Sequence, residues 1–72
     1  MKKADMIKVL QAMADDAWDV AELFEHDGDG EMAARFRGEF FGLHDAILVL
    51  TKPSYAEAMY KGYFNREGTD NA

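Results

Sequence analysis

The alternation of hydrophobic and polar positions along the chain predicts three helices. Residues 31–50 show the strongest pattern, because large apolar side chains recur there at alternating spacings of four and three, the period of an α-helix. These side chains are Phe36, Phe40, Leu43, Ile47 and Leu50. Small residues recur on the other side of the same stretch, as Ala34, Gly38, Gly42 and Ala46. A helix with two apolar faces must be covered on both, so this stretch is predicted to be the central helix of a small bundle.

Residues 4–25 have the same period and predict a first helix. Its core stripe is expected to comprise Met6, Leu10, Met13, Ala17, Val20 and Phe24, widened by Ile7, Ala14 and Ala21. Trp18 falls at the rim of this stripe. In the link that follows, Gly28 is expected to adopt a left-handed conformation and Asp29 to cap the next helix. A link this short predicts an antiparallel hairpin.

The second helix is expected to end before Pro53, because the residue before a proline is pushed out of the helical region. Ser54, with Glu57 three residues later, predicts a capping box at the start of a short third helix over residues 55–64. Residues 65–72 have nothing to bury and predict a disordered tail. The sequence therefore predicts an all-α protein. A single domain, residues 1–64, would hold a long helical hairpin and a short third helix.

The row of small residues in the second helix predicts a close approach by another element. Two glycines inside a helix cost about 2 kcal/mol relative to alanines, so their presence requires a reason. Either the third helix folds back and lays Met59 or a tyrosine on the row, or a second copy packs there. A chain of 72 residues without cysteine has a small core and no disulfide, which favours a homodimer resembling a four-helix bundle. The expected oligomer interface is Ala34, Gly38, Phe41, Gly42 and Ala46.

The distribution of charge argues against direct binding of nucleic acid. The net charge is −6, yet residues 9–34 contain eight acids and no lysine or arginine, which leaves a charge of +2 on the remainder. Acids on the first helix recur every three or four residues, so their carboxylates rise about 4.5–6 Å apart, comparable to the roughly 3.4 Å rise per phosphate of a nucleic-acid strand. The expected partner-binding residues are Asp15, Asp16, Asp19, Glu22 and Glu25.

These features favour a non-enzymatic interaction protein that binds or inhibits a basic partner protein, as a nucleic-acid mimic. Small acidic proteins of this design are typical of phage and mobile elements, an analogy from size and charge alone. The plain alternative is that the acids only keep the protein soluble. A different class is an oligomeric module for an anionic aromatic ligand such as a nucleotide. Its contacts would be Tyr55, Tyr60, Lys61, Tyr63 and Arg66.

The link between the first two helices, within FEHDGDGEM, resembles the calcium loop of an EF-hand over residues 25–36. The resemblance would place Glu25, Asp27 and Asp29 at the first three ligand positions and Gly30 at the glycine position. Phe36, however, stands where a bidentate glutamate should close the site. A plain interhelical turn is therefore the favoured interpretation, and a degenerate divalent-cation site is the alternative.

Enzymatic activity is not expected. The chain has no cysteine, a single serine at a helix start and no glycine-rich phosphate loop, so no set of residues suits nucleophilic catalysis. No cofactor is expected either. No apolar run approaches the roughly 20 residues of a membrane span, and the first residues do not resemble an export signal. We expect a cytoplasmic protein without membrane contact.

Overall fold

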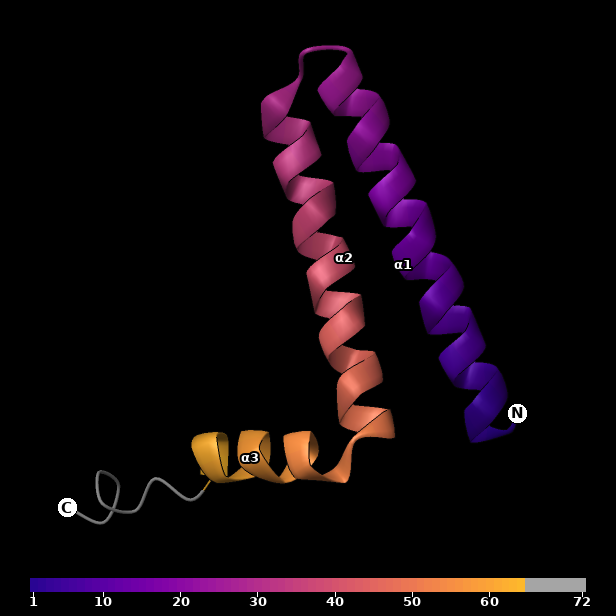
Figure 1. Ribbon diagram of the computed structural model, residues 1–72, viewed down its shortest axis with the longest axis vertical. Coiled ribbons are helices and arrows are strands. Elements are labelled where there is room, and N and C mark those ends of the chain that lie inside the picture. Colours follow the sequence, from indigo (N-terminus) through magenta and orange to yellow (C-terminus); the bar gives the residue numbers. More distant parts are fainter. Residues whose placement is uncertain (65–72) are drawn as a thin grey trace, which may run out of the picture.

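The structure is a computed structural model that describes residues 1–64, in which three helices follow one another (Figure 1). They are α1 (Lys3–His26), α2 (Gly30–Thr51) and α3 (Pro53–Phe64). Helices α1 and α2 run antiparallel as one long hairpin, and α3 turns sharply away at the end of α2 (Figure 1). The all-α class and the hairpin are confirmed. The predicted tail, residues 65–72, lies outside the described residues.

The turn between α1 and α2 follows its predicted design. Gly28 has φ 82°, a left-handed conformation that glycine adopts without strain. Asp29 accepts a hydrogen bond on Oδ1 from the Met32 N–H at 3.1 Å and so caps α2. The Asp29 N–H donates to the Phe24 carbonyl at 2.8 Å, which closes the end of α1. The left-handed glycine and the aspartate cap are both confirmed.

Gly28→Ala is expected to destabilise the protein by about 1 kcal/mol. No atom lies within 4 Å of the position that an added Cβ would occupy, so the cost is conformational rather than steric. Urea unfolding followed by circular dichroism measures it. Gly30→Ala is the matched control, because Gly30 has the same open surroundings and no positive φ. Equal stability of the two variants would contradict a strained position at 28.

The boundary between α2 and α3 differs in detail from the prediction. Lys52 is extended, with φ −126° and ψ 99°, as expected of a residue before proline. Helix α3 nevertheless begins at Pro53, and the Ala56 N–H donates to the Lys52 carbonyl at 3.0 Å. Ser54 therefore lies inside the first turn, and its prediction as the helix cap was wrong. Proline suits the first helical position because it lacks the N–H that would have no partner there.

The two long helices pack through alanines. The buried residues of residues 1–64 are Ala14, Ala17 and Ala21 of α1 and Ala33 of α2. Phenylalanines of α2 lie over α1, with ring centroids 5.7 Å apart for Phe24 and Phe36. Phe36 and Phe40 of the predicted apolar stripe of α2 lie against aromatic side chains of α1, although the stripe is only half-buried and Leu50 is exposed. The buried alanines let the two helices approach closely, and aromatic pairs lie beside this contact.

One row of apolar side chains on α1 is left uncovered. Its members Met6, Val9, Met13 and Leu23 are 47%, 49%, 51% and 67% exposed. We call them the methionine row. The prediction that Met6 and Met13 belong to the core was wrong, because the apolar stripe of α1 is wider than a single neighbouring helix can cover.

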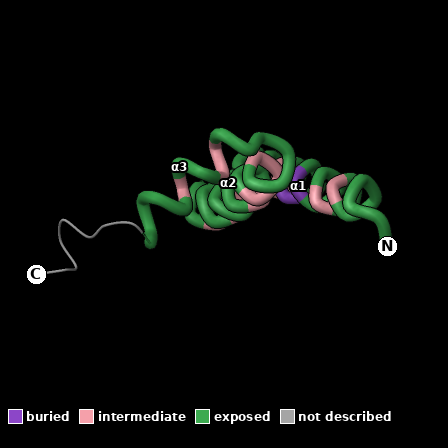
Figure 2. The backbone as a smooth tube through the Cα atoms, turned by 90° about the horizontal axis from the view of Figure 1, so that it is seen from below, coloured by how far each residue is buried: buried purple, intermediate pink, exposed green. Residues whose placement is uncertain are grey.

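The described chain is flat. It extends over 49 × 34 × 16 Å, and the smallest dimension is less than two helix diameters of about 10–12 Å each. Its radius of gyration is 16.1 Å, whereas a compact domain of this length has about 11 Å. No side chain larger than alanine is buried in residues 1–64, and Figure 2 shows buried backbone only within the hairpin. Residues 1–64 therefore form a single layer of helices.

Helix α3 adds little to the packing. It contacts α2, and its half-buried residues are Tyr55, Ala56 and Met59. Burial, together with the nearby carboxylate of Asp45, raises the pKa of the Tyr55 phenol. No described helix combines the length and apolar character needed to cross a membrane.

Candidate interaction surface

Four acidic side chains of α1 form a ridge along one side of the hairpin. These are Asp15, Asp19, Glu22 and Glu25, and we call them the acidic ridge. All four are exposed. They recur at spacings of three and four residues, so the helix places them on one face, as the sequence predicted. Asp16 is exposed as well, but it falls in register with the methionine row, between Met13 and Val20.

The ridge is largely free of internal ion pairs. The only ion pair within residues 1–64 joins Arg37 Nη2 to Glu25 Oε1 at 2.6 Å. The hydrogen bond and positive charge of Arg37 lower the pKa of the Glu25 carboxyl. Asp15, Asp19 and Glu22 form no ion pair among the described residues, although the charge of Glu22 also acts on Arg37. Exposed pairs contribute little to stability, so the ridge does not hold the hairpin together.

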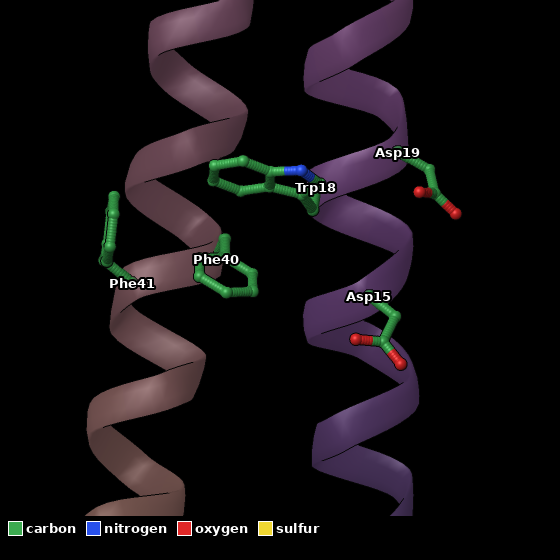
Figure 3. A pocket seen from close by; sticks show the side chains of 5 residues that line it. All are labelled: Asp15, Trp18, Asp19, Phe40 and Phe41. Carbon is green, nitrogen blue, oxygen red and sulfur yellow. The ribbon is translucent and has the colours of Figure 1, made fainter.

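Aromatic side chains bridge the two helices beside the ridge. Trp18 of α1 reaches across to α2, where its ring lies 4.9 Å from that of Phe40 (Figure 3). Phe41 meets Phe40 edge to face at 5.3 Å. The Arg37 guanidinium lies over the Trp18 ring, 5.0 Å from its centroid. Trp18 thus contacts both an aromatic ring and a cation, although only its place at the rim of α1 was predicted.

A cavity of about 530 Å³ opens next to these rings. Its lining residues come from both helices: Asp15, Trp18, Asp19, Phe40 and Phe41 (Figure 3). Two of them belong to the acidic ridge, and one, Phe41, was expected in an oligomer interface. Sequence reasoning missed this combination, because it depends on which residue of α2 lies opposite Trp18.

The row of small residues on α2 remains open. Ala34, Gly38 and Gly42 are exposed, and no atom lies within 4 Å of a Cβ built on either glycine. Ala46, the last member, is half-buried. We call these four residues the glycine row. The alternative in which α3 folds back over the row is wrong within residues 1–64, because α3 points away from the hairpin (Figure 1).

The acidic link does not gather its carboxylates. Glu25 pairs with Arg37, and Asp29 caps α2. Within residues 1–64, no group of three histidine, cysteine, aspartate or glutamate side chains is arranged to hold a metal ion. Glu25, Asp27 and Asp29 therefore act as part of a helical turn in this structure.

The tyrosines expected to bind a nucleotide are spread along α3. Tyr60 and Tyr63 are exposed and both contact Phe64, with ring centroids 5.0 and 6.3 Å apart. Tyr55 instead lies against α2, and none of the three lines the cavity beside Trp18. Lys61 is exposed on the same helix, whereas Arg66 lies outside the described residues.

Comparisons of the chain with models of known protein families, with curated proteins and with solved structures give no match.

Proposed function

We propose that the protein is a non-enzymatic interaction protein that binds a basic partner protein through the acidic ridge. One observation supports this proposal above all. Asp15, Asp19 and Glu22 are exposed on one side of α1 and have no ion pair among the described residues. Like charges at helical spacing repel one another, so this arrangement is not explained by the stability of α1.

The spacing of the ridge suits a partner that otherwise binds nucleic acid. Successive carboxylates rise about 4.5–6 Å along α1, and a basic groove made for phosphates would accept such a row. Binding by this route would occupy the groove and inhibit the partner. Because the attraction is electrostatic, it should weaken steeply as salt is added.

The double variant Asp19→Asn, Glu22→Gln is expected to stay folded and to bind the partner about tenfold more weakly, mainly through slower association. Removing repelling charges should change the stability of α1 by only a few tenths of a kcal/mol. Affinity capture of proteins from cells that express the chain, followed by association kinetics at several salt concentrations, provides the measurement.

A charge-matched control separates the ridge from net charge. The double variant Glu31→Gln, Glu57→Gln also removes two negative charges, but from exposed positions outside the ridge. We expect this control to capture the same basic protein as the wild type. If both double variants lost the captured protein equally, or if both retained it, the result would contradict the proposal.

We also propose that two copies of the chain pair through their methionine rows to form a four-helix bundle. The radius of gyration and the absence of buried large side chains in residues 1–64 support this. A second copy of the chain would supply a second layer of helices against the exposed methionine row. The glycine row with Phe41 is the alternative interface, because it too is uncovered.

A further inference from the structure

The cavity beside Trp18 is open and combines two kinds of wall. Aromatic rings form one kind, from Trp18, Phe40 and Phe41, and the last is 55% exposed. Carboxylates form the other, from Asp15 and Asp19 on neighbouring turns of α1. The Asp15 carboxylate points towards Phe40, whereas that of Asp19 points away from the rings in Figure 3. Aromatic faces attract cations, and ionised carboxylates only accept hydrogen bonds. The lining therefore matches a flat cation that donates hydrogen bonds.

The protein already shows this chemistry on the same tryptophan. The Arg37 guanidinium lies 5.0 Å from the centroid of the Trp18 ring, and its Nη2 donates a hydrogen bond to Glu25 Oε1 at 2.6 Å. One guanidinium thus contacts both an aromatic ring and a carboxylate. The carboxylate of Glu25 compensates the positive charge of Arg37, so a second cation nearby is not strongly repelled. The cavity adds the rings of Phe40 and Phe41 and the carboxylates of Asp15 and Asp19 to this tryptophan, and His44 stacks on Phe40 at 6.0 Å.

We propose that this cavity receives an arginine side chain of the basic partner, an inference that rests on the proposed function. A guanidinium is planar, stacks on rings and bonds a carboxylate through two N–H groups, whereas the ammonium of lysine does neither equally well. A nucleotide base would also stack on these rings. The two aspartates, however, would repel its phosphates.

The cavity and most of the proposed dimer interface lie on different sides of α1. Val9 and Trp18 are nine residues apart, which places them on opposite sides of the helix at 100° per residue. Leu23, at the end of the methionine row, lies one helical turn from Asp19, so pairing through Met6, Val9 and Met13 leaves the Trp18 side of the cavity open to the partner.

Trp18 is the only tryptophan of the chain, so its fluorescence reports directly on the cavity. Three synthetic peptides of equal length serve as probes, in which glycine and serine alternate with arginine, lysine or citrulline. We expect the arginine peptide to change the fluorescence and to bind about tenfold more tightly than the lysine peptide. The citrulline peptide, which lacks charge, should not bind.

Two variants identify the site. Phe41→Ala should bring the affinity for the arginine peptide down to that for the lysine peptide, because it removes an exposed wall without disturbing a buried residue. Tyr60→Ala is the matched control, since Tyr60 is an aromatic residue of similar exposure on α3. It should retain the preference for arginine.

Equal affinity for the arginine and lysine peptides in the wild type would overturn the arginine site. So would an arginine preference that survives in Phe41→Ala. If both peptides still bound and both were weakened by Asp19→Asn with Glu22→Gln, the proposed function would stand without this site. If neither the arginine peptide nor the lysine peptide bound, the result would count against both proposals.

Discussion

Ala21→Leu is expected to destabilise the protein by about 1–3 kcal/mol, a large part of the stability of so small a domain. Ala21 is 0% exposed and lies where α1 and α2 contact each other. The added side chain has no free volume there, so it must force the two helices apart. Urea unfolding at fixed protein concentration, followed by circular dichroism, measures the loss.

The control for this experiment is Ala12→Leu. Ala12 lies on the same helix and is exposed, so the substitution should change the free energy of unfolding by no more than about 0.5 kcal/mol. Equal stability of the Ala21→Leu variant and the wild type would mean that the hairpin does not pack through its alanines.

Met13→Lys is expected to convert a dimer into monomers. The wild type should have twice the 8.1 kDa mass of one chain at micromolar concentration, as measured by light scattering. Met13 lies in the middle of the methionine row and is 51% exposed in the single chain. A charge at this position would be enclosed twice in a symmetric dimer, and the dimer should weaken by about 100-fold or more.

Two further variants assign the interface. Gln11→Lys makes the same change in charge two residues away, about 200° around α1, and should leave the dimer intact. Gly42→Leu distinguishes the glycine row. If that row faces solvent, leucine should stabilise α2 by somewhat less than 1 kcal/mol, whereas at an interface it should dissociate the dimer. A wild-type mass of 8.1 kDa would end the dimer proposal for either surface.

The helices and their ends were largely predictable from the sequence. The first two were expected over residues 4–25 and 31–50, and they are α1 (Lys3–His26) and α2 (Gly30–Thr51). Gly28 and Asp29 act as predicted because the conformation at a helix end depends on residues only a few positions away. The error at Ser54 is of the same local kind, since Pro53 competes for the same helix start.

Tertiary structure decided which face of α1 lies against α2. The sequence contains two apolar rows of the same helical period side by side, one through Ala14, Ala17 and Ala21 and the other through Met6, Val9 and Met13. The helical period alone does not predict which row packs against α2, because both rows have that period. In the structure the alanines are buried, while Phe36 and Phe40 of α2 lie against Phe24 and Trp18, which flank the alanine row on α1.

The acidic ridge and the cavity also differ in whether the sequence could predict them. The ridge could be predicted, because residues on one helix face are related by spacing alone. The cavity could not, because it requires Trp18 to lie opposite Phe40, 22 residues later in the chain, and that pairing depends on how the turn sets the register of the hairpin. Local spacing determined the helices and their charged face. Which side chains meet across the hairpin was decided only when bulky rings and alanines packed together.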